Sequence, residues 1–359
     1  IALTRIQKVL DTPYHVANTS YPLSASIGVA VYPTDNADVD TLLRHADQAM
    51  YHAKQLGRNR IAWFDASHDQ ATQAAYRTLQ RIEQGLKNNE FVLFYQPKVD
   101  LKTGSILGYE ALLRWFHPEQ AMVPPMEFLP LAEEHSLIID IGVWVTEQAL
   151  RQIRAWQAMG HAWSIAVNIA PRHFQYEDFV NQLDALLKQY SDVPPNLLDI
   201  EILESVAMGD LQHVQNVIHQ CQTLGVRFSL DDFGTGFSSL SYLKKLPAET
   251  LKIDQTFVRD MLNDTDDLSM VEAIINLAKS FGRLTVAEGI ETEEQGVMLQ
   301  RLGCNIGQGY CIGRPMPAAE VIPWAMQFAP KAIWQRWSGS PTWSLEDFPL
   351  LMAERDHVN

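Results

Sequence analysis

Apolar and polar positions alternate in a regular way from residue 91 onward. Stretches with apolar residues at helical spacing end in glycine and lead into short apolar strands, each finishing on an acid, an amide or a lysine. Glycine readily adopts the left-handed conformation in which many helices end, so the repeated order of helix, glycine and strand has a physical reason. The predicted strands are Trp163–Asn168, Val226–Asp232, Leu284–Glu288 and Cys304–Gln308, which follow Gly160, Gly225, Gly282 and Gly303.

Strands and helices that alternate over about 240 residues predict a parallel sheet, and this length suits a (β/α)8 barrel of the TIM type. An open, doubly wound sheet is the main alternative. The chain lacks the glycine-rich dinucleotide-binding fingerprint that would favour such a sheet. We therefore predict an α/β barrel over residues 90–328.

The first 66 residues follow a different pattern. A β-branched strand, Ser24–Tyr32, precedes apolar residues at helical spacing from residue 40 to 56, with Gly57 as the stop signal and a short strand at Arg60–Phe64. This incomplete α/β segment is too small to close a core of its own. We predict a helical connector over residues 67–89 and, after the barrel, a Trp-rich carboxy-terminal tail over residues 329–359, whose aromatic side chains we expect to be packed rather than to bind a ligand.

Composition narrows the functional classes. The 359 residues carry a formal net charge of −15, which argues against a DNA- or RNA-binding protein because no basic stripe is available for a phosphate backbone. The chain has three cysteines, an odd number without the spacing of a disulfide framework, which indicates a reducing compartment. No apolar run reaches the ~20 residues that cross a bilayer. Because the chain begins with Ile1 and has no signal-peptide pattern, we expect a cytoplasmic fragment without membrane contact, whose parent protein can still be membrane-tethered.

Polar side chains stand at the predicted strand ends. In a (β/α) barrel these ends open onto one face, where active sites are built. Carboxylates gathered there would repel one another unless cations lay between them, and oxygen ligands without His or Cys favour Mg²⁺ or Mn²⁺ over zinc. The candidate residues are Glu110, Asn168, Glu201, Asp231, Asp232, Lys252, Glu288 and Gln308.

Several of these positions also allow a plain structural role. Arg114 lies on the same face of its strand as Glu110 and either pairs with it or contacts a phosphate. Lys252 is either a salt-bridge partner or a catalytic group. Glu204 and Glu291 lie near predicted helix starts. An acid at such a position can have a purely structural role, as a capping group or as a favourable charge at the helix N-terminus.

Seven separated motifs, in the same order, resemble the EAL domain family over residues 80–328. They include Tyr95-Gln-Pro-Lys-Val, Glu110-Ala-Leu-Leu-Arg, Asp231-Asp-Phe-Gly-Thr-Gly, Leu251-Lys-Ile-Asp, Ala287-Glu-Gly-Ile-Glu-Thr and Gln308-Gly-Tyr followed by Arg314-Pro-Met-Pro. The resemblance implies a modified (β/α)8 barrel with one antiparallel strand. It also implies hydrolysis of the bacterial second messenger cyclic di-GMP to linear 5′-pGpG with two Mg²⁺ or Mn²⁺ ions, and a homodimer formed through this domain.

Residue roles carry over position by position. One ion would be held by Glu110, Asn168, Glu201 and Asp231, and the other by Asp231, Asp232 and Glu288. Lys252 would contact the attacking water, and the resemblance makes Lys252, Glu288, Glu291 and Glu110 the candidate catalytic residues. The dinucleotide would be contacted by Gln96, Arg114, Gln308 and Arg314. Glu204 would help to hold the loop after Asp232.

Departures from the family pattern are small. Ala170 stands where relatives often carry Ser, and Leu203 stands where Thr is frequent. Neither change removes a ligand. The amino-terminal motifs Ser26-Ile-Gly-Val-Ala and Ala46-Asp-Gln-Ala-Met-Tyr resemble the final third of a GGDEF diguanylate cyclase domain. The GTP-binding signature loop of that domain is absent from this chain, so we expect no cyclase activity from it.

Three functional hypotheses remain. The first is a metal-dependent cyclic di-GMP phosphodiesterase. The second is a catalytically silent EAL module that binds cyclic di-GMP as a receptor, although such modules typically lose metal-site residues that this chain retains. The third, independent of the resemblance, is a metal-dependent barrel lyase or enolase-like enzyme that uses Lys252 as a base.

Overall fold

The computed structural model describes residues 66–207, 210–236 and 243–337. In the amino-terminal part it describes residues 14–16, 19–21, 24–33, 38–55 and 59–64, together with residues 3, 5, 6 and 9. The chain divides into two compact units, Ile1–Ile82 and Glu83–Asn359, and each is described by itself. The predicted stop at Gly57 and the tail position Trp343 lie outside the described residues.

The first unit contains a small α/β arrangement. Strands β1 (Tyr14–Val16) and β2 (Thr19–Tyr21) pair antiparallel, and β3 (Ile27–Val29) pairs parallel with β4 (Ile61–Trp63). Helix α2 (Val39–Gln55) connects β3 to β4, which confirms the predicted order of strand, helix and strand. The polar stretch after residue 65 and the apolar spacing that follows it form one helix, α3 (Ala66–Lys87).

The second unit is a closed barrel, as predicted. Strand pairing in the described chain runs β5-β13-β12-β11-β10-β9-β8-β6 and returns from β6 to β5. The pairings are parallel except that β5 runs antiparallel to both of its barrel neighbours, which confirms the single antiparallel strand. The barrel strands are β5 (Phe91–Asp100), β6 (Ile106–His117), β8 (Ser164–Asn168), β9 (Leu198–Leu203), β10 (Arg227–Phe233), β11 (Thr250–Ile253), β12 (Leu284–Ala287) and β13 (Ile306–Gly307).

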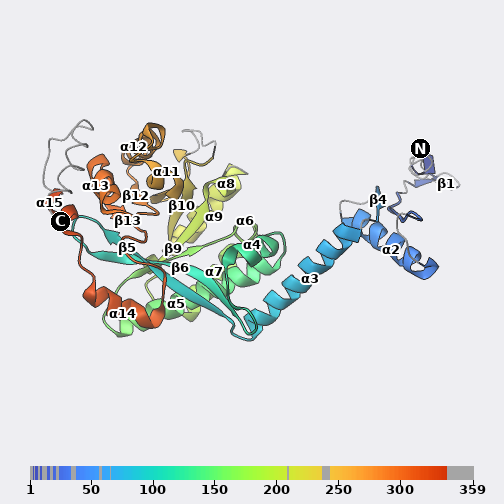
Figure 1. Cartoon of the computed structure of the whole chain (residues 1–359), viewed down its shortest axis with the longest axis horizontal. Coiled ribbons are helices and arrows are strands. Elements are labelled where there is room, and N and C mark those ends of the chain that lie inside the picture. Colours follow the sequence, from blue (N-terminus) through green and yellow to red (C-terminus); the bar gives the residue numbers. More distant parts are fainter. Residues whose placement is uncertain are drawn as a thin grey trace. The chain divides into compact units, whose positions relative to one another are not determined.

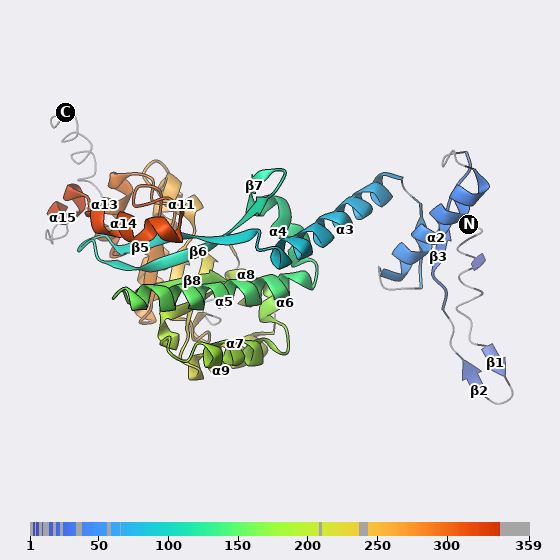
Figure 2. The same cartoon turned by 90° about the horizontal axis from the view of Figure 1, so that it is seen from below.

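Helices surround the barrel strands (Figures 1 and 2). Two short strands, β7 (Ala121–Val123) and β14 (Met316–Pro317), extend the sheet beyond the barrel. None of the described helices combines the length and the apolar character that a bilayer crossing needs. The helices are α4 (Pro125–Glu133), α5 (Leu137–Ala158), α6 (Pro171–Phe174), α7 (Phe179–Gln189), α8 (Glu204–Ala207), α9 (Leu211–Thr223), α11 (Gln255–Asp260), α12 (Thr265–Ser280), α13 (Glu293–Leu302), α14 (Ala318–Gln327) and α15 (Ala332–Trp337), with the 3-10 turn η1 (Pro195–Leu197).

Glycines stand where the sequence pattern placed helix ends. Gly160, Gly225, Gly282 and Gly303 all have positive φ, between 66° and 99°, a conformation that a side chain disfavours. Each of them ends a helical stretch and turns the chain toward the next strand. The last predicted strand is shorter than expected, because only Ile306 and Gly307 pair with β5 and β12.

Period-two alternation decides which side chains face the barrel interior. On β10, Phe228 and Leu230 are buried, and the Phe228 ring contacts Phe174 of α6. Ser229 and Asp231 alternate with them and point to the opposite face. One face of the strand therefore packs apolar side chains against the helices, and the other face carries polar side chains into the barrel.

We expect Phe228→Ala to lower the free energy of unfolding by about 3–5 kcal/mol, because the substitution leaves a cavity between β10 and α6. Urea unfolding followed by tryptophan fluorescence measures the change. Phe116 on β6 is 44% exposed, so Phe116→Ala is the matched control, and its free energy of unfolding should fall clearly less than that of Phe228→Ala. Equal losses in the two variants would contradict the packing described above.

Candidate active site

Six strands bring polar side chains to one mouth of the barrel. Strands β8, β9, β10 and β11 carry Asn168, Glu201, Asp231 and Lys252 in their carboxyl-terminal halves. Glu110 lies nearer the amino end of the longer strand β6, where it is paired with Ala166 of β8. Asp232 is also on β10, and Glu288 follows the last residue of β12. Their convergence was expected from the sequence, because parallel strands of a barrel end on one face.

Lys252 lies at the centre of this group and is 1% exposed. Its Nζ lies 2.7 Å from Oε2 of Glu201 and 2.7 Å from Oε1 of Glu288. The same ammonium lies 3.0 Å from Oδ1 of Asp231 and 3.7 Å from Oε2 of Glu110. Burial by itself would lower the pKa of Lys252, but these carboxylates together raise it well above its ordinary value. The side chain is therefore an ammonium shared by four acids.

The carboxylates form two overlapping groups that fit cations. Glu110, Glu201 and Asp231 each offer an oxygen within 4.8 Å of the others, and so do Asp231, Asp232 and Glu288. Asp231 belongs to both groups. Oxygen-only ligand sets of this kind suit Mg²⁺ or Mn²⁺.

Negative charge exceeds positive charge in this site. Burial raises the pKa of Glu201 to about 8, although Lys252 opposes the shift. Burial and the neighbouring Asp231 raise the pKa of Asp232 to about 7, and burial raises that of Glu288 well above its ordinary value. Acids that resist ionisation next to a buried ammonium indicate that further positive charge would be accommodated here.

Side-chain amides hold Glu110 in place. Asn168 Nδ2 donates to Oε1 of Glu110 at 2.7 Å, and Gln308 Nε2 donates to Oε2 at 2.6 Å. Gln308 Nε2 also donates to Oε1 of Gln96 at 3.0 Å, and Gln96 Nε2 donates to the Gly313 carbonyl. Among the described residues, Oε1 of Gln308 has no hydrogen-bond partner. The site thus contains a buried acceptor oxygen in addition to its carboxylates.

A cavity of about 440 Å³ opens above the cluster. Its walls include Arg114, Glu291 and Tyr310 in addition to Gln96 and Gln308. No carboxylate of the described residues lies within ion-pair distance of the Arg114 guanidinium, which donates to the Leu113 carbonyl instead. A simple ion pair between Arg114 and Glu110 is therefore not formed, and Arg114 faces the cavity.

Two predicted residues lie at the edge of this arrangement. The guanidinium of Arg314 lies over the Tyr310 ring, 4.2 Å from its centroid, and the side chain is exposed. Arg314 does not line the cavity itself. Glu291 lines the cavity but is not part of the carboxylate groups around Asp231. Thr292 rather than Glu291 caps the following helix.

The chain after Asp232 turns sharply and is held by Glu204. Asp232 has a φ of 51°, which is unusual for a residue other than glycine. Glu204 is 3% exposed, and its Oε2 accepts from the Gly234 N–H at 2.9 Å. A Cβ at Gly236 would lie 2.7 Å from Oε1 of Glu204, so a side chain there would collide with the carboxylate. Residues 237–242 lie outside the described part of the chain.

Comparison with known families settles the classification. The profile of the EAL domain matches residues 79–315, about two thirds of the chain, and that of the GGDEF diguanylate cyclase domain matches residues 2–60. The chain belongs to the EAL domain family. The GGDEF match at the amino terminus confirms the second resemblance.

Relatives of this EAL domain include proteins with named activities. The chain is 43% identical over 319 residues to the bifunctional diguanylate cyclase/cyclic di-GMP phosphodiesterase MucR of Pseudomonas aeruginosa, with 89% of this chain and 46% of that protein covered. It is 33% identical over 330 residues to the cyclic di-GMP phosphodiesterase PdeR of Escherichia coli, with 92% and 50% covered. The chain thus spans about half the length of these curated relatives.

Solved EAL structures have the same fold. The cyclic di-GMP complex of the PaMucR phosphodiesterase superposes with a TM-score of 0.66 at 45% identity, covering 68% of this chain and 99% of that one. The EAL enzyme Bd1971, in a form bound to cAMP and cyclic di-GMP, gives a TM-score of 0.68 at 34% identity, covering 81% and 77%.

Lys98 of this EAL domain is a site residue that was not predicted from the sequence. Lys98 Nζ lies 3.3 Å from Oε1 of Glu201 and 3.7 Å from Oδ2 of Asp199. Asp199 in turn accepts from Ser229 Oγ at 2.9 Å. Period two along β5 places Lys98 on the same face as Gln96, a signal that was available. Each oxygen of Glu201 therefore faces a different lysine.

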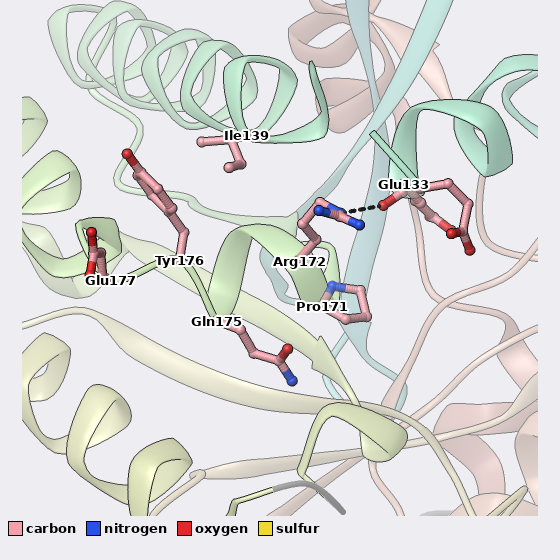
Figure 3. Close-up of a pocket in the computed structure, with 8 residues that line it drawn as sticks. Glu133, Ile139, Pro171, Arg172, Gln175, Tyr176 and Glu177 are labelled. Carbon is pink, nitrogen blue, oxygen red and sulfur yellow. Dashed lines mark hydrogen bonds between the residues drawn. The ribbon is translucent and has the colours of Figure 1, made fainter. Parts of the chain in front are cut away.

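A second hollow, of about 780 Å³, is lined by residues 133–139 and 171–177 of the EAL domain (Figure 3). Glu133 and Tyr176 are among its lining residues, and Arg172 Nε donates to the Glu133 carbonyl at 3.1 Å. None of the predicted site residues lines it. Two of its lining residues, Glu133 and Pro171, also line a further cavity of about 320 Å³ that reaches Glu201 and Asp231. Arg172 lines only the first of these two hollows and is therefore the residue suited to a control substitution.

We expect Glu204→Ala to speed hydrogen exchange of the Gly234 amide by about tenfold or more, because that N–H loses a charged acceptor worth about 1.5–3 kcal/mol. Mass spectrometry of the peptide after Asp232 measures the rate. In Glu204→Gln the side-chain carbonyl can still accept, so this variant should exchange more slowly than Glu204→Ala. Unchanged exchange in Glu204→Ala would show that Glu204 does not hold the turn.

Proposed function

We propose that this EAL domain hydrolyses cyclic di-GMP to linear 5′-pGpG with two divalent cations, Mg²⁺ or Mn²⁺. The observation that carries the proposal is the pair of carboxylate groups that share Asp231. Two cations a few ångströms apart are the usual arrangement for enzymes that cleave phosphodiesters. The cyclic di-GMP named in the titles of the PaMucR and Bd1971 structures supports the choice of substrate.

The cations would be held by the two ligand sets that the family resemblance implies. Glu110, Asn168, Glu201 and Asp231 would hold one, and Asp231, Asp232 and Glu288 would hold the other. When bound, such ions neutralise a phosphodiester and lower the pKa of a coordinated water. Because the chain is acidic overall, the bound cations would also supply the positive charge that attracts an anionic substrate.

Lys252 would act as a hydrogen-bond donor to the attacking water. Its Nζ lies within 4 Å of four of the carboxylates that would hold the cations, so a water bound between these cations would be within its reach. In the reaction, the water oxygen bonds to phosphorus and the bond from phosphorus to the 3′ oxygen breaks. The 3′ oxygen leaves as a hydroxyl after taking up a proton, and the new terminus is a 5′-phosphate.

The remaining polar residues would bind the dinucleotide. Gln96, Arg114 and Gln308 lie around the cavity. An arginine that forms no ion pair with any described carboxylate is suited to a phosphate. Arg314 would act from the rim, next to Tyr310. Assembly as a homodimer through the EAL domain stays a prediction from the family resemblance.

The two rival functions differ from this proposal in specific ways. A silent receptor would bind cyclic di-GMP without forming pGpG, but the retained metal-site residues favour catalysis. A lyase or enolase-like reaction would need Lys252 to accept a proton from carbon, and an enzyme of that kind would leave cyclic di-GMP intact.

We expect Glu110→Ala and Asp231→Asn each to lower turnover of cyclic di-GMP by at least about 100-fold, because each variant removes a carboxylate that would bind a cation. Chromatographic detection of pGpG in Mg²⁺ or Mn²⁺ measures the rate. Glu272 is an exposed acid on α12, and Glu272→Ala should match the parent protein. Hydrolysis at the parental rate by either site variant would refute the two-metal assignment.

We expect Arg114→Gln to raise the KM for cyclic di-GMP by about 10–100-fold with a much smaller change in kcat, since a charge-assisted hydrogen bond to phosphate is worth about 1.5–3 kcal/mol. Steady-state kinetics separates the two parameters. Arg172→Gln, in the hollow of Figure 3, is the matched control and should leave KM unchanged. A parental KM in Arg114→Gln would rule out the phosphate contact.

A further inference from the structure

The segment that follows the matched EAL residues packs on α13, the helix that begins just after Glu291 and Thr292. Helix α15 (Ala332–Trp337) lies past residue 315, where the family match ends, and packs against α13 (Figures 1 and 2). Trp334 is fully buried in this contact. Its burial agrees with the packing role expected for the aromatic tail.

A glycine in α13 makes room for the indole. A Cβ at Gly296 would lie 2.4 Å from Nε1 of Trp334, a distance at which the two groups collide. Glycine inside a helix lowers stability by about 1 kcal/mol relative to alanine. Its presence in the interior of α13 is therefore explained by the tryptophan that fills the space above it.

Two polar contacts join this segment to the first residue of α13. Trp334 Nε1 donates to the Glu293 carbonyl at 2.8 Å. Lys331 Nζ lies 3.3 Å from Oε1 of Glu293. Both contacts act at the start of the helix, next to the residues that line the catalytic cavity.

The start of α13 in turn holds the backbone of Glu291. Gln295 is 3% exposed, and its Oε1 accepts from the Glu291 N–H at 2.7 Å and from the Thr292 N–H at 3.0 Å. Its Nε2 donates to the Arg259 carbonyl. A continuous set of contacts thus leads from Trp334 through Glu293 and the first turn of α13 to Glu291.

We propose that Trp334 is a positioning residue that sets Glu291 at the mouth of the catalytic cavity. Among the described residues, Trp334 is not one of those that line the cavity or form the carboxylate groups. It acts through α13, which it contacts at Glu293 and Gly296. The segment Lys331–Trp334 is then a clamp on the rim of the EAL barrel. This inference rests on the proposed phosphodiesterase function only for its kinetic readout.

The kinetic test is a double-mutant cycle between Trp334 and Glu291. We expect Trp334→Ala to lower kcat/KM for cyclic di-GMP by about tenfold, since small displacements of a site residue have effects of this order or larger. In the Glu291→Ala background the same substitution should lower kcat/KM by less than about twofold, because the group that it positions is already gone. Equal effects in both backgrounds would overturn the proposal.

A matched core variant controls for lost stability. Leu150 on α5 is fully buried and lies outside both the clamp and the site. Leu150→Ala should change kcat/KM by the same factor in the parental and Glu291→Ala backgrounds. Trp334→Phe keeps an aromatic ring but loses the N–H that donates to Glu293, so it should fall between the parent and Trp334→Ala.

Hydrogen exchange tests the clamp without any turnover. The Glu291 and Thr292 amides should exchange at least about tenfold faster in Trp334→Ala than in Leu150→Ala, because the first turn of α13, which carries their acceptor Gln295, loses its contact with Trp334. Unchanged exchange would overturn the clamp even in an active enzyme. If the parent protein forms no pGpG but these amides exchange faster in Trp334→Ala, the proposed function is wrong and the positioning role of Trp334 is supported.

Discussion

The buried ammonium of Lys252 is the interaction on which the rest of the site depends. Four carboxylates from different segments lie within 4 Å of one nitrogen. Removing such charges from water is costly unless each has a partner, so the acids can gather only around a cation. One ammonium, with Lys98 behind Glu201, does not balance them all. Burial, with a smaller contribution from the neighbouring acids, raises the pKa of Glu201 and of Glu288.

Barrel closure turns this electrostatic arrangement into a site. Strand β5 runs antiparallel to its neighbours and pairs Gln96 directly opposite Glu110, which brings an amide and a second lysine to the carboxylates. Strands β9 and β10 supply Glu201 and Asp231 from their carboxyl-terminal halves, and β6 supplies Glu110 from its amino-terminal half. Because apolar residues alternate with these polar ones, the same strands pack against the outer helices and keep the polar groups at fixed spacings.

Residues outside the strands hold the loops at the mouth of the barrel in place. Glu204 holds the turn after Asp232 through the Gly234 amide, and α13 holds Glu291 through Gln295. The first of these contacts joins two segments of the barrel, whereas the second is backed by Trp334 from beyond the matched family region. Rim residues are therefore set by local hydrogen bonds and docking, and the central carboxylates by the sheet itself.

Sequence by itself determined the barrel, its glycine-ended helices and the polar strand ends, because period-two and helical spacing, turn glycines and motif order are local properties of the chain. It also placed Glu110, Glu201 and Asp231 correctly at one mouth. Tertiary structure alone decided that Lys252 would be shared by four acids, that Lys98 would join them, and that Trp334 would fill the space above Gly296. These outcomes depend on distances between residues far apart in the chain, which are fixed only when the barrel closes and the helices dock.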